Sequence, residues 1–124
     1  MGYDIWTRAL KAIIPNDNLD RAFEELRDFW SEGSVEVPDS LDGLLEGMGF
    51  EGESRPDGYI LTGYSGSYYF MDEILAILAK HLQDGSWIVW EGDEGEIWCT
   101  YTRDGQIHSF DAMITFPGLD EVRL

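Results

Sequence analysis

The chain has 124 residues and a mass of 14.1 kDa, which fits a single domain spanning 1–124. Hydrophobic residues make up 44% of the sequence, enough to build a core, so the composition excludes a disordered chain. The 25 acidic and 8 basic side chains give a formal net charge of −17, which argues against direct binding to nucleic acid or to an anionic membrane.

The first two elements expected are a strand and a helix. Residues 3–14 show a two-residue alternation up to Pro15, which interrupts the run and predicts a strand. From 18 to 31, apolar residues recur every three or four positions behind Asp17 or Asn18 as capping residue. This spacing predicts an amphipathic helix.

The middle of the chain is expected to hold a shorter helix, a turn and a strand. Asp39 or Ser40 can cap the helix, and Gly47 or Gly49 can end it. The sequence RPDG at 55–58 is typical of a turn. The β-branched and aromatic residues that follow this turn predict a strand.

The last part of the chain predicts one more helix and a strand meander. The stretch MDEILAILAKHLQDG predicts a helix capped near Asp72 and ended by Gly85. Strands are predicted in SWIVWE, EIWCTYT and IHSFDAMITF, joined by turns at GDEG and RDGQ, before Pro117. Together these elements predict the α+β class: a largely antiparallel sheet, two to three helices packed on one face, and a C-terminal meander of three to four strands.

The stretch DGSWIVWEGDEGEIWCTYTRDGQ, residues 84–106, resembles a group of small acidic proteins from bacterial and phage genomes. In this chain the stretch follows a predicted helix, and the chain opens with a predicted strand that ends in IIP. The resemblance implies the same order of helix and meander. It carries over neither an activity nor a functional residue.

The sequence contains no motif that predicts catalysis, a cofactor or a metal site. Cys99 is the only cysteine, so an internal disulfide is impossible, and we interpret it as a small hydrophobic residue packed in a strand. His81 is expected at the surface near a helix end and His108 in the meander, without metal-ligand spacing. The segment GMGFEG at 47–52 has the letters of a dinucleotide fingerprint, but it follows a predicted helix instead of a strand. With no secretory signal pattern and no long apolar run, the sequence predicts a cytoplasmic protein without cofactor or metal.

Acidic residues are concentrated in the first half of the chain. Between Asp17 and Asp57 there are 13 acidic and 3 basic residues. Asp20, Glu24 and Asp28 recur at every fourth position, so one face of the predicted helix carries like charges about 6 Å apart. A row of this kind favours a cationic partner.

We therefore predict a non-catalytic binding protein, a nucleic-acid mimic that inhibits a nucleic-acid-binding enzyme or defence complex in the manner of anti-CRISPR and anti-restriction proteins. The expected partner is the basic surface of that protein, with neither nucleic acid nor membrane bound directly. The contact residues expected are carboxylates of the first two helices, followed by those of a hairpin tip: Asp20, Glu24, Asp28, Glu32, Asp42 and Glu46, then Asp93, Glu94 and Glu96.

Three other interpretations of the sequence are open. In the first, the protein is an interaction or immunity module whose contact surface is aromatic, made of Tyr64, Tyr68, Tyr69 and Phe70, and the acids only keep it soluble. In the second, it is a small hydrolase that uses carboxylates. In the third, the acidity reflects a salt-adapted host, because the chain has only two lysines.

Overall fold

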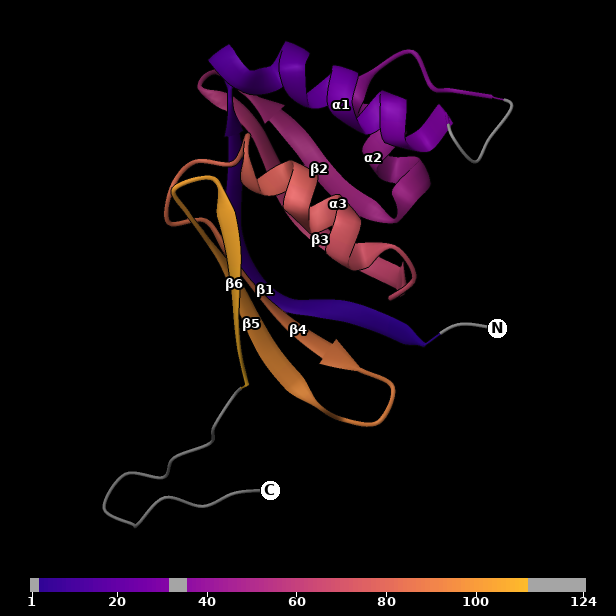
Figure 1. Ribbon diagram of the computed structural model, residues 1–124, viewed down its shortest axis with the longest axis vertical. Helices are drawn as coiled ribbons and strands as arrows, with labels where there is room; N and C mark the ends of the chain where they lie inside the picture. The colour runs from indigo at the N-terminus through magenta and orange to yellow at the C-terminus, as the bar shows by residue number, and fades with distance from the viewer. Residues whose placement is uncertain (1–2, 32–35, 112–124) are drawn as a thin grey trace.

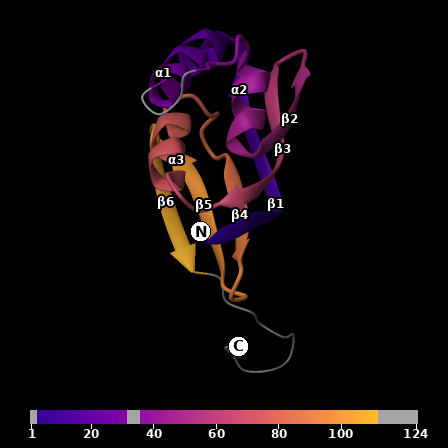
Figure 2. The same cartoon turned by 90° about the vertical axis from the view of Figure 1, so that its right-hand side faces the viewer.

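Six antiparallel strands form one sheet in the order β2-β3-β1-β4-β5-β6, with three α-helices on one side of it (Figures 1 and 2). The computed structural model describes residues 3–31 and 36–111. The strands are β1 (Asp4–Pro15), β2 (Phe50–Arg55), β3 (Gly58–Ser67), β4 (Trp87–Gly92), β5 (Ile97–Arg103) and β6 (Gln106–Asp111). The helices are α1 (Leu19–Ser31), α2 (Leu41–Met48) and α3 (Met71–Ala79), and a short 3₁₀ turn (Asn16–Asn18) precedes α1. The predicted α+β class and the C-terminal meander of β4, β5 and β6 are confirmed.

Strand β1 lies at the centre of the sheet and pairs with both β3 and β4. Its pairing with β4 shifts register between Thr7 and Ala9. Before this bulge Ile5 is buried, and after it Ala12 and Ile14 are, so the side chains that face the helices change from odd to even positions. The two-residue alternation of the sequence predicts the strand and misses this change of face.

Each helix buries one apolar stripe against the sheet. Ala22 and Leu26 are the buried residues of α1, and Leu44 and Leu45 those of α2. Helix α3 is the most deeply packed, because five of its nine residues are buried. The core that results is closed by Phe50, Tyr64 and Trp90 from three different strands.

The observed helix ends partly match those predicted. Ser40 caps α2, since its Oγ accepts a hydrogen bond from the Gly43 amide at 3.0 Å, and Gly49 ends it in the left-handed conformation with φ 105°. Helix α3 is shorter than predicted and begins after Phe70 instead of Asp72. It stops at Ala79 because the backbone of the next segment forms hydrogen bonds with the sheet instead of continuing the helix. The amide of Gln83 donates to Ile13 O at 2.8 Å.

Strand β2 was not predicted. Its sequence, FEGESR, combines two glutamates with a glycine, a composition with low strand propensity. It becomes a strand because the turn at Pro56 and Asp57 returns the chain antiparallel along β3. The predicted extension of the last strand beyond Asp111 lies outside the described residues.

Candidate functional site

Charge is distributed unevenly between the helices and four of the six strands. We define the helix layer as residues 16–31, 36–48 and 71–80; it contains eleven acidic and three basic side chains. By contrast, strands β1, β4, β5 and β6 together contain three acidic and three basic residues. The helix layer therefore has a net charge of −8, whereas these four strands are neutral.

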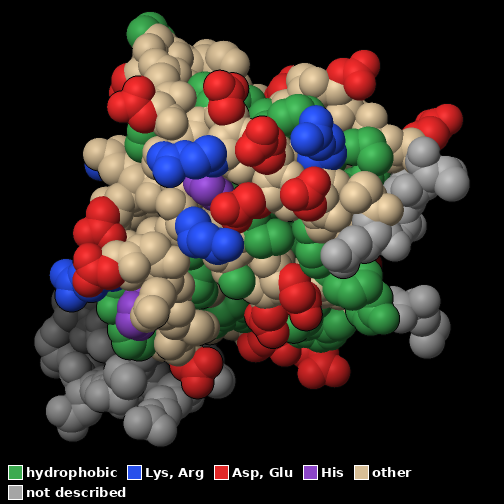
Figure 3. Space-filling model, turned by 45° about the horizontal axis from the view of Figure 1, so that its top comes forward, with side chains coloured by type: hydrophobic (Ala, Val, Ile, Leu, Met, Phe, Trp, Pro, Cys, Tyr) green, Lys and Arg blue, Asp and Glu red, His purple; other side chains and the backbone are tan. Residues whose placement is uncertain are grey.

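Helix α1 carries the predicted row of acids on its outer surface. Asp20, Glu24 and Asp28 are all exposed, and each step of four residues advances about 6 Å along the helix. In the described part of the chain, no basic group lies within ion-pair distance of these three side chains. Arg21 and Arg27 lie on the same helix, and acidic and basic side chains are interspersed over the side seen in Figure 3. Glu32, the fourth predicted member of the row, lies outside the described residues.

Glu25 differs from that row because it faces two basic groups of the segment after α3. Lys80 Nζ lies 3.0 Å from its carboxylate, and His81 Nε2 lies 3.3 Å away. The neighbouring Lys80 ammonium, and then His81, lower the pKa of Glu25 despite an opposing effect of burial. His81 was predicted at the surface, and this is wrong: only 4% of it is exposed, because the turn after α3 brings it against α1.

The two predicted acids of α2 have different surroundings. Asp42 accepts a hydrogen bond from the Tyr59 hydroxyl at 2.6 Å, which ties α2 to β3. Burial, then this hydrogen bond, raises the pKa of Tyr59. Glu46 is exposed one turn further along the same helix. Asp42 therefore has a structural partner, whereas Glu46 is directed to solvent.

The acids of the hairpin tip lie far from the acids of α1. Asp93, Glu94 and Glu96 lie in or beside the turn between β4 and β5, at the opposite end of the molecule from α1 (Figure 1). Asp93 Oδ2 accepts a hydrogen bond from the Asp4 amide at 3.1 Å, and Glu96 Oε1 accepts one from the Glu94 amide at 3.2 Å. The fold thus places the two predicted groups of contact residues on separate parts of the surface.

An aromatic surface lies where β3 leads into α3. We call Tyr68, Tyr69 and Phe70 the aromatic patch; their exposed fractions are 39%, 72% and 53%. Phe70 has a φ of 67°, the left-handed region that residues other than glycine rarely adopt. Tyr64, which the sequence interpretation grouped with these residues, is 6% exposed and packs against Phe50 and Trp90 in the core.

The face of the sheet opposite the helices carries a second group of rings. The strand register aligns Lys11, Trp87, Tyr101 and His108 in one row across β1, β4, β5 and β6. The Tyr101 and His108 rings stack with centroids 5.0 Å apart. This row was not predicted, although the sequence carries a signal for it: β4 and β5 have apolar residues on both of their faces, whereas a face exposed to solvent is expected to be polar.

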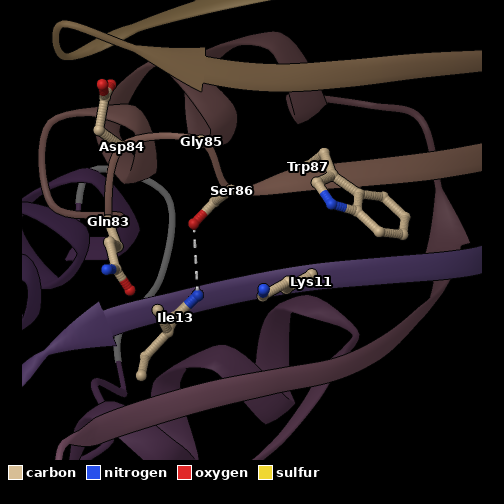
Figure 4. Close-up of a pocket in the computed structure, with 7 residues that line it drawn as sticks. All are labelled: Lys11, Ile13, Gln83, Asp84, Gly85, Ser86 and Trp87. Atoms are coloured by element: carbon tan, nitrogen blue, oxygen red, sulfur yellow. Dashed lines mark hydrogen bonds between the residues drawn. The ribbon is translucent and has the colours of Figure 1, made fainter.

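Two features of this face bear on chemistry. A pocket of about 190 Å³ opens beside the row and is lined by Lys11, Gln83, Asp84, Ser86 and Trp87 (Figure 4). Ser86 Oγ accepts a hydrogen bond from the Ile13 amide at 3.5 Å, so the hydroxyl is held by the backbone and not by a base. Cys99 lies partly exposed on the same face, outside the helix-side core, and burial raises the pKa of its thiol, which opposes a nucleophilic role.

Among the residues that the structure describes, no group of three or more His, Cys, Asp and Glu side chains is placed to hold a metal ion. Over the same residues, no helix has the length and apolar character needed to cross a membrane. Comparison with known proteins finds no match to this chain among family models, curated proteins or solved structures.

Proposed function

We propose that this protein is a non-catalytic binding protein whose acidic helix layer occupies a basic groove of a nucleic-acid-binding protein and so inhibits it. One observation carries the proposal: the helix layer holds a net charge of −8, whereas strands β1, β4, β5 and β6 are neutral. Negative charge gathered on one layer attracts a cationic surface and orients the encounter. Strands β1, β4, β5 and β6 lack that excess.

The spacing of the carboxylates on α1 limits how closely the helix layer can imitate a nucleic acid. Duplex DNA presents about one charge per 1.7 Å of axis, whereas the α1 row presents about one per 6 Å, with arginines beside it. The row is therefore a sparse substitute for a phosphate backbone. We expect it to speed and orient binding, with non-ionic contacts supplying the rest of the affinity.

The test identifies the partner and then separates the two acidic regions. The immobilised chain captures proteins from lysate at low salt, and a salt gradient or added duplex DNA releases them. The purified partner is then titrated with wild type, with the triple variant D20N/E24Q/D28N, and with D93N/E94Q/E96Q, which removes the same charge at the far hairpin tip.

We expect the α1 variant to weaken binding about three- to hundredfold, since each lost surface ion pair is worth roughly 0.2–1 kcal/mol. The hairpin-tip variant is expected to change the affinity less than about twofold, because charges outside the interface are screened over roughly 8–10 Å. Equal losses in both variants, or binding that neither salt nor DNA alters, would contradict the proposal.

A second candidate function is an interaction module that binds its partner through aromatic side chains. The exposure of Tyr69 and Phe70 favours it, because large aromatic groups are enriched among residues that dominate interface energies. Under this alternative, alanine at Tyr68 and Tyr69 abolishes binding, whereas neutralising Glu24 and Asp28 has no effect.

A further inference from the structure

We propose that the aromatic patch, together with Asp72 and Glu73, is the anchoring site for arginine side chains of the cationic partner. This inference rests on the proposed function and specifies which chemistry of the partner is recognised. It unites two properties that the sequence interpretations had kept apart, acidity and exposed aromatic rings.

Backbone hydrogen bonds anchor the aromatic patch, while two of its rings stay largely exposed to solvent. The amide of Tyr68 donates to Tyr3 O at 2.7 Å, and the amide of Met71 donates to Tyr68 O at 2.9 Å, so the segment is fixed on both sides. The Tyr69 and Phe70 rings meet edge to face with centroids 4.3 Å apart. Phe70 thus keeps an unfavourable left-handed backbone without burying its ring in the core, a combination that points to a role at the surface.

Burial, and then the nearby carboxylates of Asp72 and Glu73, raise the pKa of the Tyr68 hydroxyl, so both carboxylates lie close to this member of the aromatic patch. Asp72 and Glu73 are exposed in the first turn of α3, and Asp72 also accepts a hydrogen bond from the Tyr68 hydroxyl at 3.1 Å. Within the described ranges, neither carboxylate has a basic group at ion-pair distance. Their two negative charges exceed the partial positive charge of the helix N-terminus, roughly half an elementary charge. The surface therefore remains attractive to cations.

Exposed aromatic rings near carboxylates that have no basic partner among the described residues match guanidinium better than ammonium. A guanidinium group is planar, stacks on aromatic rings and forms paired hydrogen bonds with a carboxylate. A lysine ammonium is strongly hydrated and gains less from the rings. An anionic membrane would be repelled by these carboxylates, and a second copy would bring together two chains of net charge −17, so we assign the surface to an arginine-rich protein segment.

The experiment compares an oligo-arginine peptide with an oligo-lysine peptide of the same length, each titrated against the full chain by fluorescence anisotropy. Both peptides have equal charge, so their long-range electrostatic attraction to the helix layer is the same. The aromatic patch predicts tighter binding of oligo-arginine by about two- to fivefold for each guanidinium that stacks. The double variant Y69A/F70A is expected to bring the ratio close to one.

Phe110 provides a matched control, because its ring is 56% exposed but lies on β6. The F110A variant is expected to keep the preference for arginine. Phe70→Gly is the second variant at the site, since glycine removes the ring while accepting the left-handed backbone, and it too is expected to lose the preference.

Each outcome has one meaning. No preference in wild type, or a preference that survives both Y69A/F70A and F70G, overturns this inference. If the two peptides still bind in a salt-dependent way that D20N/E24Q/D28N weakens, the proposed function stands without it. If neither peptide binds, both the proposed function and this inference are contradicted.

Discussion

The left-handed backbone of Phe70 leads to a quantitative prediction about stability. Phe70 caps α3 with φ 67° and ψ 5°. Alanine and glycine at this position lose the same ring contacts, with Phe29 at 5.9 Å and with Tyr69, so their difference isolates the backbone. The left-handed conformation costs an L-residue roughly 1–2 kcal/mol, while glycine loses about 0.5–1 kcal/mol more entropy than alanine on folding. We therefore expect Phe70→Gly to be more stable than Phe70→Ala by about 1 kcal/mol.

The assay is urea unfolding of both variants at neutral pH, followed by circular dichroism. Ala76 provides the matched control, because it is exposed in the interior of the same helix. There the order reverses: Ala76→Gly is expected to lower the free energy of unfolding by about 1 kcal/mol. If F70A proves as stable as F70G or more so, while A76G is destabilised as expected, the argument from backbone strain fails.

Three further predictions concern buried polar groups. Trp90 Nε1 donates to Thr100 Oγ1 at 2.9 Å in the core, so Thr100→Val is expected to destabilise the protein by about 1–3 kcal/mol in urea unfolding. Thr102→Val should be neutral or stabilising, because the buried Thr102 Oγ1 has no hydrogen-bond partner among the described residues; equal losses would contradict this. The pKa of Tyr59 is raised in the folded state, so the tyrosine of the unfolded chain ionises first as the pH rises. The free energy of unfolding is therefore expected to be unaffected by this group below about pH 10 and to fall as the pH rises further. Denaturation midpoints across that range should show a shallower fall for Tyr59→Phe, and an unchanged slope would refute the assignment.

Local sequence patterns predicted the elements whose signals are contained within a few residues. The apolar spacing of α1, the Ser40 cap and Gly49 end of α2, and the turns of the meander depend on contacts between near neighbours. The row of Asp20, Glu24 and Asp28 belongs to the same class, because helical periodicity alone places residues four apart on one face.

Features that depend on distant partners could not be predicted in this way. Strand β2 exists because β3 pairs with it, and α3 stops at Ala79 because the following backbone bonds to β1 and β5. The burial of His81 depends on α1, which is more than fifty residues earlier in the chain. In each case a long-range contact outweighs a weak local preference.

Composition and periodicity alone predicted the α+β class of this acidic chain and the row of carboxylates on one helix. Tertiary structure alone decided which charges share a surface: it placed a net charge of −8 in the helix layer, left strands β1, β4, β5 and β6 neutral, and separated the hairpin tip from α1. It also directed Tyr69 and Phe70 outward while burying Tyr64 five residues before Tyr69. The reason is physical: side-chain direction follows from local geometry, whereas the neighbours of a side chain depend on how the strands order themselves in the sheet.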